Sequence, residues 1–136
     1  MKRAFRAALL RAGLALDDIA FINAHGTGTV LNDRCEAAAF AGLAEEAGFS
    51  TPPFFSTKRF TGHTLGAAGT LEFIFTMLML RDGFVPASPG CKTLDPALAC
   101  APLTSPLKLP DETRFAASTS LAFGGTDAVL IAERLG

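Results

Sequence analysis

The chain has 136 residues, of which 49% are hydrophobic, and its formal net charge at pH 7 is -1. This length and composition fit one globular domain with its own core and exclude a disordered chain. The nearly neutral charge gives no electrostatic reason to expect nucleic acid or an anionic membrane as a partner. Cys35, Cys91 and Cys100 have no CxxC spacing, which favours neither a metal site nor disulfides and indicates a reducing, cytoplasmic location.

The most apolar stretch, residues 65–80, is too short to cross a membrane. A bilayer span needs roughly 20 residues, and this stretch also carries Glu72 at its centre. Because it is apolar nearly all round, we expect a helix buried in the core and no membrane span.

The first third of the chain predicts a helix followed by a buried strand. Residues 2–12 have the periodicity of an amphipathic helix, and Gly13 is a suitable residue to end it. Residues 19–23 are almost wholly apolar, as in a strand whose sheet is covered on both faces. A second short strand is expected over residues 54–57, after a Pro-Pro turn.

Two further helices are expected between and after these strands. Asp33 and Glu36 have the spacing of a capping box, which predicts an alanine-rich helix that begins at Asp33 and stops at Gly48. The small residues of segment 62–69 fit the start of another helix pressed closely against neighbouring backbone.

The last third of the chain predicts an irregular segment and then a hairpin. Six of the eight prolines lie between residues 84 and 114, which indicates an ordered wrap over the surface. Residues 115–122 and 126–133 read as two strands, and the short connection between them implies antiparallel pairing. The helical crossovers before them imply parallel, right-handed connections. The fold class is therefore α/β, with a mixed sheet of at least four strands covered by helices, in one domain over residues 1–136.

The two histidines mark the candidate site. His25 follows the first strand in a Gly/Thr-rich turn, and His63 lies in a similar turn after the second strand, with Lys58 between them. The carboxyl ends of strands are where open α/β sheets bind ligands. The positive end of a helix disfavours an imidazolium at His63, so a neutral ring there can donate an N–H. Two such donors suit a reaction that builds negative charge on an oxygen.

Three motifs carry a resemblance to a known family. They are Asn23-Ala24-His25-Gly26-Thr27-Gly28-Thr29 with Asp33 and Glu36, then Ser56-Thr57-Lys58 with Gly62-His63-Thr64-Leu65-Gly66-Ala67-Ala68-Gly69 and Glu72, and Phe123-Gly124-Gly125-Thr126. In this order and spacing they resemble the C-terminal half of β-ketoacyl-acyl-carrier-protein synthases of the KAS I/II type, in the thiolase superfamily. The second motif alone would also suit a thiolase, whereas the first motif and Lys58 favour the ketosynthase.

The resemblance implies decarboxylative Claisen condensation in fatty-acid or polyketide synthesis. His25 and His63 would hold the malonyl thioester carbonyl and stabilise the enolate. Lys58 would orient His63, with Glu72 as its partner in a charge network that also includes the acidic residues of the first motif, Asp33 and Glu36. No metal or other cofactor is implied, because the substrates are carried on the phosphopantetheine of acyl carrier protein.

The remaining roles concern the substrate chain. Thr27 and Thr29 would hydrogen-bond the phosphopantetheine arm. Phe123 and Gly124 would contact substrate, with Phe123 gating the acyl pocket and its backbone N–H contributing to a second oxyanion hole.

The departures from the family pattern limit these expectations. The family's nucleophilic cysteine belongs to an N-terminal half that this sequence does not contain, and none of its three cysteines is flanked like an activated nucleophile. The opening strand of the C-terminal half is also expected to be absent. Four positions near the third motif, where the family commonly has Asn, Phe, Gly and Asn, hold different residues: Thr119, Leu121, Ala122 and Asp127.

We therefore expect the chain alone to be inactive in condensation and to expose a sheet edge or helix face. An N-terminal ketosynthase half or a second copy would cover that face, and acyl carrier protein would be the other partner. Two alternatives remain open. One is a non-catalytic subunit like a chain-length factor, against which the retained histidines and Lys58 argue; the other is an inactive remnant of a truncated ketosynthase.

Overall fold

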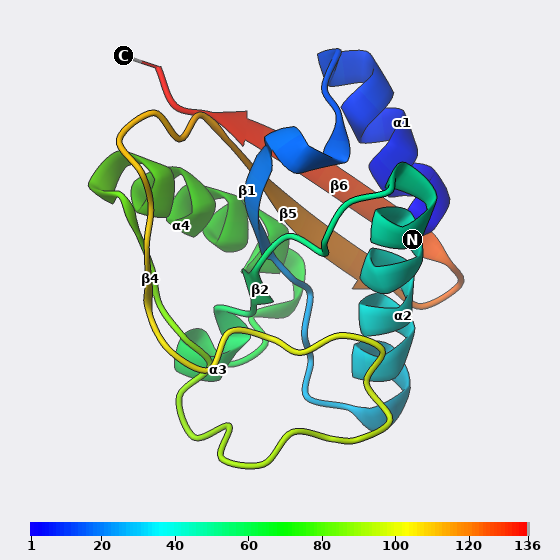
Figure 1. Cartoon of the computed structure of the whole chain (residues 1–136). Coiled ribbons are helices and arrows are strands. Elements are labelled where there is room, and N and C mark those ends of the chain that lie inside the picture. Colours follow the sequence, from blue (N-terminus) through cyan, green and yellow to red (C-terminus); the bar gives the residue numbers. More distant parts are fainter. Residues whose placement is uncertain (136) are drawn as a thin grey trace.

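The computed structural model describes residues 1–135 and shows a four-stranded mixed sheet between two layers of helices. The sheet order is β2-β1-β5-β6, in which β2 and β5 run parallel to β1 and β6 runs antiparallel to β5. Its strands are β1 (Ile19–Asn23), β2 (Phe54–Phe55), β5 (Phe115–Ala122) and β6 (Thr126–Glu133). The expected fold class, parallel crossovers and C-terminal hairpin are confirmed (Figure 1).

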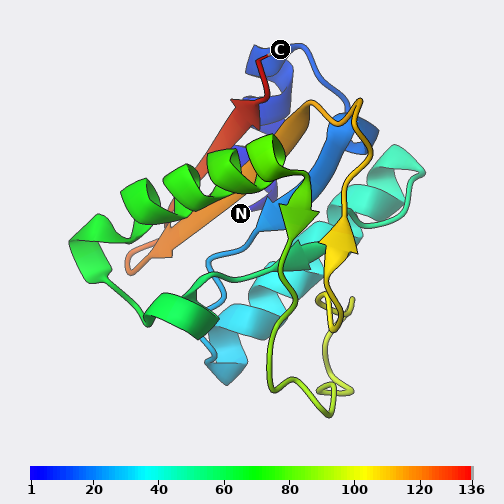
Figure 2. The same cartoon turned by 90° about the vertical axis from the view of Figure 1, so that its left-hand side faces the viewer.

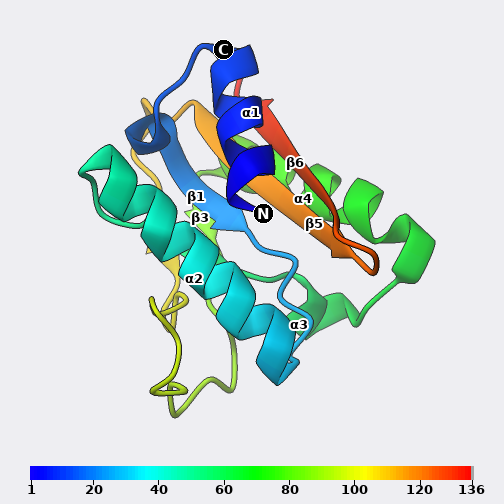
Figure 3. The same ribbon diagram turned by 90° about the vertical axis from the view of Figure 1, so that its right-hand side faces the viewer.

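Helices cover both faces of the sheet. Helices α1 (Lys2–Ala12) and α2 (Val30–Ala47) lie on one face, as Figure 3 shows, and α4 (Ala68–Asp82) lies on the other, as Figure 2 shows. Each face has its own buried apolar cluster. Phe5, Ile22 and Phe40 belong to the first cluster, and Phe21, Phe55 and Leu80 to the second. Strand β1 contributes Ile19 and Ile22 to the first cluster and Phe21 to the second, which is why nearly the whole strand is apolar.

Short elements connect these layers. They are the 3-10 turn η1 (Leu16–Asp18), helix α3 (Lys58–Thr61), the 3-10 turn η2 (Leu65–Ala67) and strands β3 (Phe84–Val85) and β4 (Leu107–Lys108). The antiparallel β3–β4 pair was not predicted; it closes the base of the proline-rich segment, residues 86–106. That segment is an ordered wrap, as expected, because backbone bonds such as Leu103 N–H to Phe54 O tie it to the sheet.

Three sequence-based expectations are wrong in detail. Helix α2 begins at Val30 with Thr29 at its N-cap, so Asp33 lies inside the helix and does not cap it. Strand β2 has only two residues, because Thr57 already has helical φ/ψ angles ahead of α3.

The third concerns α4, which is not buried all round. The sheet covers one side of this helix, and the other side exposes the apolar side chains of Ile74, Met77 and Leu78. A helix with an uncovered apolar face is typical of a surface that another protein segment contacts. Within residues 1–135, no helix is both long and apolar enough to cross a membrane.

Candidate active site

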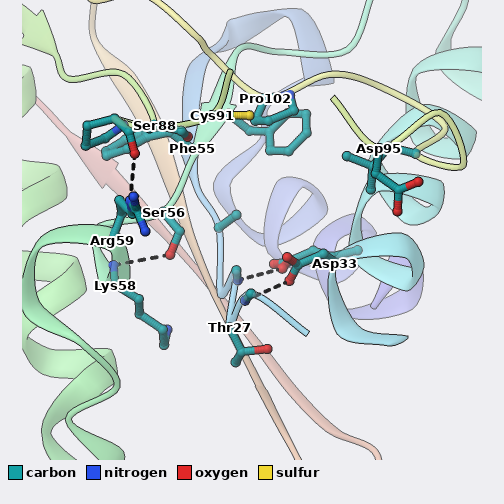
Figure 4. Close-up of a pocket in the computed structure, with 18 of the residues that line it drawn as sticks. Thr27, Asp33, Phe55, Ser56, Lys58, Arg59, Ser88, Cys91, Asp95 and Pro102 are labelled. Carbon is teal, nitrogen blue, oxygen red and sulfur yellow. Dashed lines mark hydrogen bonds between the residues drawn. The ribbon is translucent and has the colours of Figure 1, made fainter. Parts of the chain in front are cut away.

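The candidate site lies where the loops after β1 and β2 meet. A cavity of about 540 Å³ opens there, bounded by the His25 loop, α3 and the proline-rich segment. Lys58 and His63 line it together with Thr27, Asp33 and Glu36. Figure 4 shows Ser56, Lys58 and Arg59 on one side of this cavity and Asp33 and Asp95 on the other. Parallel neighbouring strands end at the same edge of a sheet, which explains why residues so far apart in sequence meet here.

His25 is a buried imidazole held in its neutral form. Its side chain is only 7% exposed, and its Nδ1 lies 3.1 Å from Lys58 Nζ. Burial, followed by the positive charge of Lys58, lowers the pKa of His25 to about 4. An ammonium group can only donate, so Nδ1 accepts and the ring proton sits on Nε2. His25 therefore offers an Nε2–H donor at neutral pH.

His63 stands against His25 with a donor of the same kind. The ring centroids are 5.4 Å apart and the planes are nearly perpendicular, at 86°. The backbone N–H of Leu65 donates to His63 Nδ1 at 3.2 Å, which again leaves the proton on Nε2. Leu65 has a φ of 51°, a left-handed conformation that is costly for a branched residue and that is typical of functional sites.

Lys58 and Glu72 form an ion pair beneath the histidines. Both side chains are buried, and Lys58 Nζ donates to Glu72 Oε1. Burial raises the pKa of Glu72, and the neighbouring Lys58 opposes that rise. The ammonium contacts the ring of His25, whereas the resemblance implied that it would orient His63. Lys58 thus links a buried carboxylate to the imidazole that it keeps neutral.

The backbone of His25 is fixed by a second buried carboxylate. Glu36 Oε1 accepts the N–H of His25 at 2.8 Å, and Glu36 Oε2 accepts the N–H of Gly26 at 2.9 Å. The Gly26 position tolerates no side chain, because a Cβ there would lie 2.5 Å from Cβ of Ser56. The side chain of Glu36 therefore reaches from α2 to the His25 loop and holds it. Its spacing from Asp33 is the same as in a capping box, although Asp33 does not cap the helix.

Comparison with known proteins agrees with this geometry. Residues 1–92 match the protein family described as "Beta-ketoacyl synthase, C-terminal domain". The chain belongs to this family. It is 41% identical over 127 residues to the mitochondrial 3-oxoacyl-[acyl-carrier-protein] synthase of Arabidopsis thaliana, an alignment that covers 91% of this chain and 27% of that protein.

Solved ketosynthase structures share the fold. The ketosynthase ApeO of Xenorhabdus doucetiae, in complex with its chain length factor ApeC, is 40% identical with a TM-score of 0.85, over 97% of this chain and 32% of that one. The complex of a type II polyketide acyl carrier protein with its ketosynthase, AntDE:AntF, gives 27% identity and a TM-score of 0.88, over 98% of this chain and 32% of that one. The chain thus spans about a third or less of the length of these relatives.

Some of the other expected residues of this ketosynthase domain lie at the cavity, and others lie away from it. Thr27 lines the cavity, and its hydroxyl lies 3.0 Å from that of Thr29. Asp33 Oδ1 accepts the N–H of Gly28 at 3.2 Å, which holds the next turn of the loop. Phe123 and Gly124 lie in the exposed β5–β6 turn and do not line the cavity.

Two contributors to the candidate site were not identified from the sequence. Asn23 is fully buried; its amide donates to Glu72 O at 3.0 Å, and its carbonyl accepts the N–H of Thr57 at 3.2 Å. An amide at the end of an apolar strand is a signal that could have identified it. Thr119, on β5, bonds both His25 and Glu36, and no sequence pattern indicates that contact.

No group of three or more His, Cys, Asp or Glu side chains within residues 1–135 is arranged to hold a metal ion.

Proposed function

We propose that this domain supplies the malonyl-decarboxylation half of a β-ketoacyl synthase active site. The observation that carries the proposal is the pair of adjacent imidazoles, each with its Nε2–H as the free donor. Two Nε2–H donors on adjacent rings can hold a thioester carbonyl and stabilise the enolate oxygen that forms from it.

The reaction proceeds in two steps. The bond between the malonyl methylene carbon and its carboxylate breaks, CO2 leaves, and the electron pair moves into the enolate, whose oxygen accepts from His25 and His63. The enolate carbon then attacks an acyl thioester on a cysteine, and that cysteine leaves as the thiolate. Lys58 and Glu72 act through His25, because the ammonium occupies Nδ1 and so keeps Nε2 as the donor.

The cysteine that carries the acyl group is not expected from this chain. Cys35 is exposed on α2, and burial raises the pKa of Cys100, which is the wrong direction for a nucleophilic thiolate. Cys91 lines the cavity from the proline-rich segment, but none of the three cysteines is flanked like an activated nucleophile, so we assign the nucleophile to the N-terminal ketosynthase half. The uncovered face of α4 supports that assignment, since the partner half would bury its apolar side chains.

We expect the substrates to be thioesters carried by an acyl carrier protein, in the cytoplasm. Thr27, which lines the cavity wall, and Thr29 beside it would hydrogen-bond the amides of a phosphopantetheine arm. The acyl carrier protein in the AntDE:AntF complex supports this partner class.

The test is to purify the chain alone and together with a co-expressed, cysteine-bearing N-terminal half of a β-ketoacyl synthase. Alone, the chain should form no thioester with acyl-carrier-protein substrates, and the pair should release CO2 from malonyl-acyl carrier protein faster than the N-terminal half by itself. A stoichiometric thioester on any of the three cysteines of the isolated chain would contradict the assignment of the nucleophile. A stable pair without CO2 release would instead favour a non-catalytic, chain-length-factor-like subunit.

A further inference from the structure

Thr119 occupies an unusual place in the hydrogen bonding of the His25 loop. It lies on β5, is fully buried, and stands one residue beyond Ser118, which is the register partner of Asn23. The parallel pairing of β1 with β5 ends at that register pair. The Thr119 side chain continues the connection past it, to the backbone of His25.

The hydroxyl of Thr119 acts as acceptor and donor at once. It accepts the N–H of His25 at 3.1 Å and donates to Glu36 Oε1 at 2.7 Å. Because Glu36 Oε1 also accepts the same His25 N–H at 2.8 Å, the three groups form a closed triangle. A side chain that only donates or only accepts cannot complete it, which restricts the position to groups with both capacities.

This triangle anchors His25 to a central strand of the sheet. Glu36 reaches the loop from α2, and Thr119 reaches it from β5, so the backbone of His25 is held from two elements. The side chain of His25 then meets Lys58 on one side and His63 on the other. A shift of the His25 backbone would move its ring relative to both.

We propose that Thr119 is a positioning residue for His25, whose hydroxyl fixes the imidazole against Lys58 and His63. The inference rests on the proposed function for its catalytic meaning, but it is tested on the isolated chain. The charged and titratable groups around the His25 ring are Lys58, His63 and Asp33, with Glu72 behind Lys58 and Glu36 on the backbone side.

The experiment compares Thr119→Val with Thr119→Ser by NMR. Valine keeps the shape but removes both hydrogen bonds, whereas serine keeps both. We expect the valine variant to exchange the His25 amide proton about tenfold faster, which corresponds to the loss of one net hydrogen bond. We also expect its His25 ring to titrate above the wild-type pKa of about 4, because the ring moves away from burial and Lys58. The serine variant should restore both values.

The control is Ser120→Ala, which removes a hydroxyl from the next residue of β5 on the opposite face of the sheet. It should leave both His25 readouts at the wild-type values. If Thr119→Val does not fold, Thr119→Cys replaces it, because a thiol is a weak donor and acceptor. Unchanged exchange and titration of His25 in a folded variant would overturn the positioning role, whatever happens to its overall stability. Failure of decarboxylation in the reconstituted pair would instead count against the proposed function.

Discussion

Lys58→Met should lower the free energy of unfolding of this domain by about 3–5 kcal/mol at pH 7. The substitution leaves the carboxylate of Glu72 buried without the ammonium that pairs with it, and Glu72 Oε2 already has no hydrogen-bond partner among the described residues. Urea denaturation measures the loss. Replacing both residues, as Lys58→Met with Glu72→Leu, should recover most of it, because no unpaired charge then remains buried.

The loss should depend on pH in a defined direction. Without Lys58, burial remains the largest influence on Glu72, and its folded-state pKa rises further above the unfolded value of 4.5. Between these two values the unfolded chain releases the proton first, so the stability of the variant falls as pH rises and returns as pH drops towards 4.5.

A matched control separates this effect from the loss of any lysine. Lys92 is exposed on the proline-rich segment, and Lys92→Met should change stability by no more than about 0.5 kcal/mol. A deficit in Lys58→Met that is below 1 kcal/mol, or that is equal at pH 5 and pH 8, would contradict the proposed network.

His25→Ala and His63→Ala should each slow CO2 release by the reconstituted pair roughly 100- to 1000-fold. In the proposed reaction, each substitution removes one of two donors that hold the same developing oxyanion. Because the donors share one oxygen, the double variant should fall short of the product of the two single effects. The measurement is kcat for release of labelled CO2 from malonyl-acyl carrier protein.

Folding must be checked beside these rates. Cys35→Ser changes an exposed side chain on α2 that is outside the proposed machinery, and it should keep wild-type kcat. If either histidine variant kept wild-type kcat while folded, that histidine would not be an oxyanion donor.

The sequence predicted the elements whose signal is local. The amphipathic periodicity and Gly13 predicted α1, and the apolar run predicted β1. The register in which β1 pairs with its neighbours could not be predicted from that run. The start of α2 was misplaced because Asp33 and Glu36 point back to the His25 loop, and their spacing is the same in a capping box. The exposure of α4 depends on which neighbours cover it, and composition does not contain that information.

The candidate site was predictable to a similar extent. Two loops after parallel neighbouring strands had to meet, so His25, Lys58 and His63 were placed together correctly in space. Phe123 lies apart from them, because it follows Ser118, the register partner of Asn23, by five residues, or about 16 Å along an extended strand, and its role as a gate stays a prediction. The contact between Lys58 and His25 depends on side-chain direction and could not be read from spacing.

We propose that both imidazoles donate an Nε2–H to one oxygen. The most direct test is two-bond ¹H–¹⁵N NMR of the ring nitrogens of this chain, which has only two histidines. We expect both rings to carry a proton on Nε2 at pH 7, and the His25 ring to stay neutral until the pH falls to about 4. A proton on Nδ1 of either ring, or a His25 ring that titrates near 6.5, would contradict it.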